Sequence, residues 1–186
     1  MTVIGITGTI GAGKGTVTKY LTDNYGFKSY SVRDFLIEEI NRRGLAVNRD
    51  SMVDVANDLR ATHGPGYIVS ELYKRAQQNS GNTIIESVRT IGEVETLKNK
   101  PNFSLLAIDA DIKQRYERIK NRESSTDSIS FEKFVEDEQR ELTSNDPGKQ
   151  NLLGCIKLAD YVILNNKGLP ELKTQVDSII NTLQNP

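Results

Sequence analysis

The strongest constraint on this chain is a glycine-rich stretch near its start, Gly8-Thr9-Ile10-Gly11-Ala12-Gly13-Lys14-Gly15-Thr16. An apolar run, Val3-Ile4-Gly5-Ile6, precedes it, and a segment with helical character, Val17-Thr18-Lys19-Tyr20-Leu21, follows it. A strand, a glycine loop and a helix in this order let backbone N–H groups surround an anion at a helix N-terminus, where the helix dipole also favours negative charge. The stretch therefore predicts a loop that binds nucleotide phosphates.

The spacing within this loop assigns roles to two side chains. Gly8, Gly13 and Lys14 satisfy the pattern G-x-x-x-x-G-K, in which the lysine reaches the outer phosphates. Gly15 stands where Ser or Thr is usual, and Thr16 follows one place later, so Thr16 is the hydroxyl that we expect to ligate Mg²⁺. The alternative is a glycine-rich turn without chemical meaning, which the preceding strand disfavours.

Size, charge and cysteine content limit the partners. The 186 residues fit one domain. The 24 basic and 25 acidic residues give a net charge of -1, which disfavours binding to nucleic acid. Cys155 is the single cysteine, so no internal disulfide forms and a reducing compartment is favoured. With no evident signal peptide or membrane-spanning apolar run, we expect a cytoplasmic protein without nucleic-acid or membrane partners.

Short apolar runs alternate with longer amphipathic stretches, which is typical of α/β proteins with right-handed crossovers. Continuous runs such as Leu105-Leu106-Ala107-Ile108 indicate strands buried on both faces, and hence a parallel sheet. Strands are expected at 2–7, 27–30, 83–88, 104–110 and 161–165. Helices are expected near 14–24, 33–43, 50–62, 66–78, 90–99, 111–122, 130–143 and 148–158, with a last one over 169–183.

Two stretches interrupt this alternation. Several expected helices, without an obvious strand, lie between 31 and 80, and two polar loops flank a helix within 122–150. We therefore expect one domain over 1–186 with a five-stranded parallel sheet in a three-layer α/β/α arrangement. A helical insertion at about 31–80 and a short flap at about 122–150 would extend from it.

Four segments resemble the nucleoside monophosphate kinases, which include the adenylate kinases. They are the Gly-Lys-Gly-Thr form of the loop, Ser31-Val32-Arg33-Asp34-Phe35-Leu36, Ile84-Ile85-Glu86-Ser87-Val88-Arg89-Thr90 and Arg118-Ile119-Lys120-Asn121-Arg122. The whole chain is more similar still to small archaeal P-loop kinases. This resemblance implies a P-loop kinase fold, ATP and Mg²⁺ as cofactors, an acceptor-binding insertion at 31–80 and a lid at 122–150.

The resemblance also implies the residues of the donor site. Arg118 would stack on the donor base and Arg122 would contact its phosphates; four residues apart, they share one face of a helix. A solvated helix face is the alternative for this pair. The implied nucleotide-binding set is Gly11, Ala12, Gly13, Lys14, Gly15, Thr16, Arg118 and Asn165.

The acceptor side is expected to use arginine, because its planar guanidinium binds phosphate through two parallel hydrogen bonds. Arg89 follows a buried strand, at the sheet edge where ligands of open α/β sheets collect. The alternative role for Arg89 is a surface ion pair with Glu93. Arg33 and Arg60 are further candidates. Relative to adenylate kinases the chain differs at Arg33, Ile37 and Glu86-Ser87, which bears on the acceptor more than on ATP.

Three more charged residues are candidates for the site. Glu86, at a strand end, is costly to bury unless it is paired, so we expect it to hold a water on Mg²⁺ near the acceptor. Asp34 either interacts with a helix dipole, or orients the acceptor and takes its proton. Arg140 either closes over the phosphates as a catalytic residue or pairs with Glu136 or Glu141.

The sequence thus predicts an enzyme that moves the γ-phosphate of ATP to a nucleoside monophosphate, as a monomer or weak homodimer with small-molecule substrates. Lys14, Arg122, Asp34 and Arg140 are its expected catalytic residues. One alternative is a kinase of another small phosphorylated metabolite. Dephospho-coenzyme A is the foremost of these, because the C-terminal segment resembles its kinase, although the Asp-x-Asp of that enzyme is not visible here. The other alternative is a regulatory P-loop ATPase.

Overall fold

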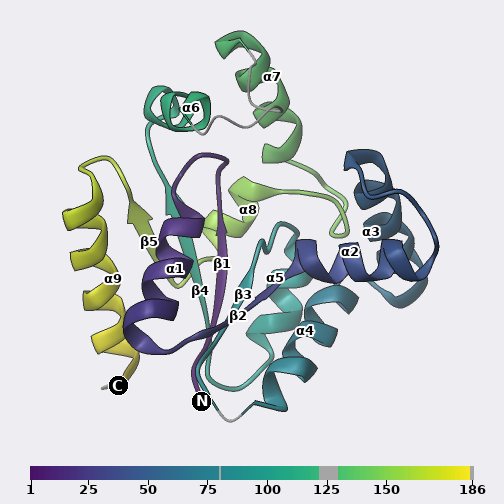
Figure 1. The fold of residues 1–186 in the computed structure, drawn as a ribbon, viewed down its shortest axis with the longest axis horizontal. Helices are drawn as coiled ribbons and strands as arrows, with labels where there is room; N and C mark the ends of the chain where they lie inside the picture. Colours follow the sequence, from purple (N-terminus) through teal and green to yellow (C-terminus); the bar gives the residue numbers. More distant parts are fainter. Residues whose placement is uncertain (80, 122–129, 185–186) are drawn as a thin grey trace.

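Five short strands form one parallel sheet in the order β2-β3-β1-β4-β5 (Figure 1). The structure is a computed structural model and describes residues 1–79, 81–121 and 130–184. β1, the central strand, is buried at every position, as its apolar run predicts for a strand covered on both faces. The strands are β1 (Val3–Gly8), β2 (Lys28–Ser31), β3 (Thr83–Glu86), β4 (Phe103–Asp109) and β5 (Tyr161–Leu164). The predicted five-stranded parallel sheet is confirmed.

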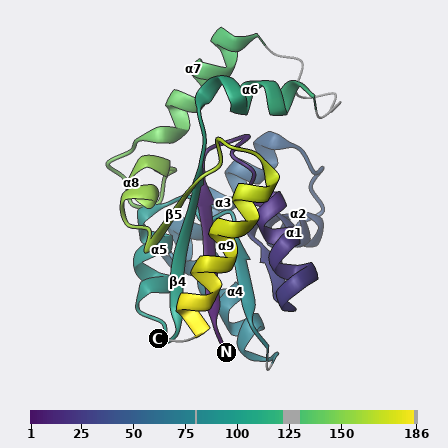
Figure 2. The same ribbon diagram turned by 90° about the vertical axis from the view of Figure 1, so that its left-hand side faces the viewer.

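Helices cover both faces of this sheet and give three layers (Figures 1 and 2). One face packs against α1 (Lys14–Tyr25) and α9 (Leu169–Gln184). The other face packs against α4 (Tyr67–Gln77), α5 (Ile91–Lys98) and α8 (Leu152–Lys157). No helix within the described residues is long and apolar enough to cross a membrane.

The remaining four helices lie at the margins of the layers. Between β2 and β3, α2 (Val32–Arg42) and α3 (Arg49–His63) contact each other and α4. The expectation of several helices without a strand in this stretch is therefore confirmed for the described residues. In both views α6 (Ile112–Lys120) and α7 (Phe131–Leu142) lie beyond the end of the sheet from which the β1–α1 loop emerges (Figures 1 and 2).

Two of the boundaries that differ from those expected lie near the carboxyl edge of the sheet. β3 ends at Glu86 rather than at Val88, because Ser87 has a positive φ of 66° and turns the chain out of the sheet. α8 begins at Leu152 rather than near 148, because the residues before it form a turn in which Asp146 accepts hydrogen bonds from Gly148 and Lys149. The early end of β3 places Arg89 in the turn that follows the strand.

Cys155 provides a test of the core, because it lies on α8 with none of its surface exposed. Burial, together with the negative charge of Glu93, raises the pKa of the Cys155 thiol to about 12. Since the thiolate is the reactive form, we expect the native protein at pH 8 to resist a thiol reagent such as Ellman's reagent. One equivalent should react after unfolding in guanidinium chloride. Rapid labelling of the native protein would contradict this packing.

Candidate active site

The β1–α1 loop, Gly8 to Gly13, is held so closely that it requires its glycines. Gly8, Gly11 and Gly13 have φ values of +133°, +77° and +106°, which side-chain-bearing residues rarely adopt. A Cβ atom at Gly11 would lie 2.6 Å from the carbonyl oxygen of Arg115, and one at Gly8 would collide with that of Ile108. The loop is therefore wedged between β4 and α6, in the conformation that lets backbone approach a ligand.

Lys14 begins α1 and reaches back over this loop. Its Nζ donates hydrogen bonds to the carbonyl oxygens of Gly8 at 2.8 Å and Thr9 at 2.7 Å. Thr16 is exposed in the same first helical turn. The structure thus brings the ammonium of Lys14 against the loop, with the hydroxyl-bearing Thr16 at the helix N-terminus beside it.

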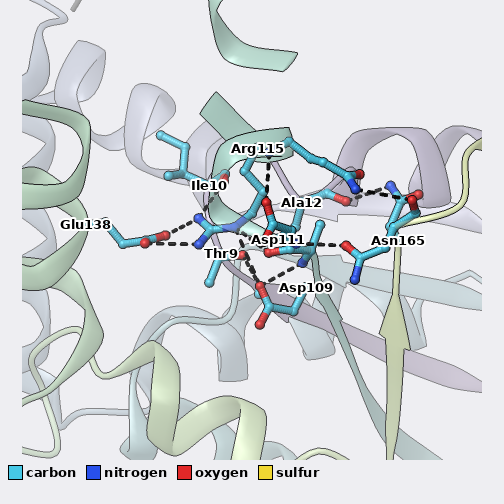
Figure 3. A network of polar contacts seen from close by, with 12 residues as sticks. Thr9, Ile10, Ala12, Asp109, Asp111, Arg115, Glu138 and Asn165 are labelled. Carbon is cyan, nitrogen blue, oxygen red and sulfur yellow. Dashed lines mark hydrogen bonds and ion pairs between the residues drawn. The ribbon is translucent and has the colours of Figure 1, made fainter. Parts of the chain in front are cut away.

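Asp109, the last residue of β4, holds the first part of the loop. Its Oδ1 accepts a hydrogen bond from Thr9 Oγ1 at 2.6 Å and another from the backbone N–H of Ala110 at 2.8 Å (Figure 3). A hydrogen bond to a charged acceptor is stronger than one between neutral groups. Thr9 and Asp109 therefore hold the start of the loop in place, and sequence analysis did not indicate this pair.

Arg115, on α6, is the centre of a buried polar network that sequence analysis missed (Figure 3). Its Nε donates to the carbonyl of Ala110 at 2.8 Å and its Nη1 to that of Ile10 at 3.2 Å. Both Nη atoms bind the carboxylate of Glu138 on α7, Nη2 at 3.0 Å. One side chain thus ties the phosphate loop, the end of β4 and α7 together.

Asn165 and Arg118 lie on the other side of the loop. Asn165 Nδ2 donates to the carbonyl oxygen of Ala12 at 2.8 Å, and Arg118 Nη2 donates to the carbonyl of Asn165 at 2.7 Å. Arg118 Nη1 is buried and has no hydrogen-bond partner within the described residues. The structure therefore brings both residues to the loop with which the sequence grouped them. Arg122 lies outside the described residues.

A cavity of about 190 Å³ opens at the loop. The loop and the start of α1 line it, together with one residue each from the β3–α5 turn, α7 and α8. The lining residues are Gly8, Ile10, Gly11, Gly13, Lys14, Gly15, Arg89, Glu141 and Leu152. The Nη1 of Arg89 lies 3.4 Å from Glu141 Oε2 and 3.5 Å from Gln150 Oε1. Arg89, the favoured acceptor candidate, thus shares a cavity with the phosphate loop.

Glu93 holds the backbone of Arg89 in place. This carboxylate is fully buried at the start of α5, and its Oε2 accepts the backbone N–H groups of Arg89 at 2.9 Å and Thr90 at 3.2 Å. Its Oε1 binds Nη2 of Arg60 on α3 at 2.7 Å. The side-chain ion pair weighed for Arg89 is therefore formed by Arg60 instead, and Arg60 supports the Arg89 turn without lining the cavity.

Arg33 and Asp34 are both exposed in the first turn of α2, and neither lines the cavity. The backbone N–H of Asp34 is capped by Ser31 Oγ at 3.3 Å. Their position at the carboxyl end of β2 is next to the carboxyl end of β3, where Ser31 pairs with Glu86. They lie at the correct edge of the sheet but outside the cavity.

Arg140 does not line the cavity either. It is exposed on α7 and forms ion pairs with Glu136 and Asp137 of its own helix. Of the two carboxylates considered for it, Glu136 is the partner, while Glu141 contacts Arg89. The structure thus favours the ion-pair interpretation of Arg140.

The residues present fit a nucleotide with Mg²⁺. Among the described residues, no group of three or more His, Cys, Asp or Glu side chains could hold a metal by itself. Mg²⁺ commonly binds through one or two protein oxygens and the phosphates of a substrate. Thr16 could supply one such oxygen. Glu86 could supply another, since it is half-buried, accepts a hydrogen bond from Ser29 and pairs with Ile6 just before the loop.

The Arg115–Glu138 pair leads to a prediction about stability. Each side chain is 6% exposed, so removing Glu138 leaves a buried guanidinium whose remaining carboxylate, Asp109, lies 3.7 Å from its Nε. We expect Glu138→Ala to lower the free energy of unfolding by about 3–5 kcal/mol, measured by urea denaturation. Glu136→Ala, which removes an exposed carboxylate from the same helix, should lower it by about 0–1 kcal/mol. Equal losses for the two variants would contradict the account.

Comparisons with known proteins bear on the family and the fold of this chain. Residues 4–143 match the family described as an AAA domain. A UPF0200 protein of Methanococcus maripaludis (strain C6) is 32% identical, over 98% of this chain and 100% of that protein. The shikimate kinase from Bacteroides thetaiotaomicron superposes with a TM-score of 0.58 at 11% identity, over 98% of both chains.

A second solved structure, the shikimate kinase from Acinetobacter baumannii in complex with shikimate, has a TM-score of 0.57 at 17% identity and covers 99% of this chain and 93% of its own. At this identity the likeness concerns the fold alone, which is the three-layer α/β/α P-loop kinase fold with a five-stranded parallel sheet. The predicted fold class is confirmed. The chain belongs to the AAA-domain family, by the match over residues 4–143, and to the UPF0200 proteins, by the match over 98% of its length.

Proposed function

We propose that this protein is an ATP-dependent phosphotransferase whose acceptor is a nucleoside monophosphate. The observation that carries the proposal is the shared cavity, which is lined by Lys14 and the phosphate loop and also by Arg89. Phosphoryl transfer requires donor and acceptor to be held in line, with cationic groups around the transferring phosphate. A cavity with an ammonium and a guanidinium from different elements meets that requirement.

The donor end would be bound by the loop. Its backbone and Lys14 would hold the ATP phosphates, and the Thr16 hydroxyl, with Glu86 through a water, would hold Mg²⁺. Mg²⁺ supplies positive charge that offsets the charge on the phosphate oxygens. Arg118 would contribute its unpartnered Nη1 beside the loop, where Asn165 already binds the Ala12 carbonyl.

The acceptor end would be bound by Arg89. Its backbone N–H is held by the buried Glu93, so the guanidinium starts from a well-defined position. A phosphate acceptor is already ionised near neutral pH and needs no general base, which is consistent with a cavity that presents arginine to it. The helices α2, α3 and α4 would form the acceptor-binding insertion, and α7 would belong to the lid.

One observation favours a second candidate, a kinase of a hydroxyl acceptor such as dephospho-coenzyme A. The carboxylate of Asp34 is exposed at the carboxyl edge of the sheet, and no hydrogen bond or ion pair to it is formed within the described residues. A free carboxylate at this edge could take the proton of a sugar hydroxyl.

The test is a panel of ribo- and deoxynucleoside monophosphates plus dephospho-coenzyme A, each incubated with ATP, Mg²⁺ and the purified protein. We expect ADP to form together with a nucleoside diphosphate for at least one member. Phosphorylation of dephospho-coenzyme A alone would instead support the second candidate. ATP hydrolysis that no acceptor accelerates, and that responds only to a protein partner, would support a regulatory ATPase.

Lys14→Ala should abolish phosphotransfer and leave the fold intact, because the Lys14 ammonium is the cation that the helix α1 aims at the phosphate loop. We expect the turnover number to fall by at least about 10²–10³-fold, with a circular-dichroism melting curve close to that of the wild type. The matched control is Lys19→Ala, an exposed lysine of the same helix, which should leave turnover unchanged. Near-normal turnover of Lys14→Ala would contradict the assignment of the loop to the active site.

Arg89→Ala should weaken acceptor use much more than ATP use. Loss of a charge-assisted hydrogen bond corresponds to roughly a 10- to 100-fold rise in the acceptor KM, while the KM for ATP changes by less than about twofold. Lys19→Ala removes an exposed cation of α1 and should leave both values unchanged. Steady-state kinetics with each substrate varied in turn measures the effect, and an unchanged acceptor KM would exclude Arg89 from the site.

A further inference from the structure

The helix α7 carries two carboxylates three residues apart, Glu138 and Glu141, and each contacts an arginine of a different element. Glu138 binds Arg115, whose Nη1 also donates to the Ile10 carbonyl of the phosphate loop. Glu141 contacts Arg89, which follows β3. A single helix therefore links the donor loop to the acceptor arginine.

The two contacts differ in how readily they open. The side chains of Glu138 and Arg115 are each 6% exposed, and both oxygens of the carboxylate are engaged (Figure 3). Glu141 and Arg89 are 23% and 39% exposed, and their ion pair has an N–O distance of 3.4 Å. Buried, doubly hydrogen-bonded pairs are strongly held, whereas long, partly exposed ones contribute little to stability. The Glu141 contact is therefore the one that can give way.

The position of Glu141 is unusual for its charge. Its carboxylate lines a cavity whose other lining residues include Lys14, Arg89 and the glycines of the phosphate loop. Carboxylate and phosphate oxygens bind the same N–H groups of a guanidinium, so they compete for it. A negative side chain on Arg89 thus takes the place that an acceptor phosphate would need.

We propose that Glu141 is a placeholder for the phosphate group of the acceptor. It binds Arg89 when no acceptor is present and is displaced when the phosphate of the acceptor arrives, while Glu138 keeps α7 attached to the phosphate loop. The proposal rests on the proposed function, in which Arg89 binds that phosphate. It makes Glu141 a specificity-determining residue, because a phosphate of nearly two negative charges displaces one carboxylate and an uncharged ligand does not.

The test measures binding of inorganic phosphate by isothermal titration calorimetry, with the phosphate loop filled by ADP and Mg²⁺. It compares the wild type, Glu141→Gln, Arg89→Ala and the double variant, with Glu95→Gln, an exposed carboxylate of α5, as the control for net charge. We expect Glu141→Gln to lower the Kd for phosphate by about three- to fivefold. The same change should have no effect in the Arg89→Ala background, and Glu95→Gln should match the wild type.

An unchanged or raised Kd in Glu141→Gln would overturn the proposal. So would an equal tightening in the Arg89→Ala background, which would indicate general repulsion rather than competition for Arg89, and so would failure of both the wild type and Glu141→Gln to bind phosphate. The readout is separate from catalysis. Tightened phosphate binding without any phosphorylated acceptor would contradict the proposed function alone, and phosphorylated acceptors without tightening would contradict the placeholder alone.

Discussion

The rest of the site depends on the buried guanidinium of Arg115. Removed from water, it must be matched by a carboxylate and by carbonyl groups, and the structure supplies Glu138, Ala110 and Ile10. Those partners belong to α7, to the turn after β4 and to the phosphate loop. Because an unmatched buried charge is so unfavourable, these three segments can separate only at a large cost in free energy. The loop therefore keeps its shape while the exposed parts around it remain free to respond to a ligand.

The parallel sheet explains why residues far apart in the sequence meet here. All five strands end at the same edge, so the phosphate loop after β1, Arg89 after β3, Asp109 at the end of β4 and Asn165 after β5 gather around one space. Each contributes a different contact: Asp109 and Asn165 hold the loop, and Arg89 faces it across the cavity. Arg89 and the phosphate loop are thus neighbours as a consequence of topology, and α7 contributes one carboxylate, Glu138, to Arg115 and another, Glu141, to Arg89.

Features that depend on local pattern could be predicted, and those that depend on distant pairs could not. The apolar runs predict the five strands, and the glycine spacing predicts the loop and its lysine. The Arg115–Glu138 pair spans 23 residues and Arg60–Glu93 spans 33, so neither has a local signature. The residues around Arg115 in the sequence are mostly polar, so nothing in the local pattern indicated that Arg115 is buried. The burial of Glu138 could have been inferred, because it lies one turn from Phe134 on the same face of α7. A buried carboxylate needs a partner of opposite charge.

The central claim is that one cavity accepts the donor phosphates and the acceptor phosphate at the same time. It is tested most directly by the affinity of an analogue in which an adenosine and a second nucleoside are joined by a chain of five phosphates. Because the second contact becomes intramolecular, we expect this analogue to bind at least about a hundredfold more tightly than ATP. Most of that gain should disappear in Arg89→Ala. An analogue that binds no more tightly than ATP, in a protein that binds ATP normally, would contradict the account.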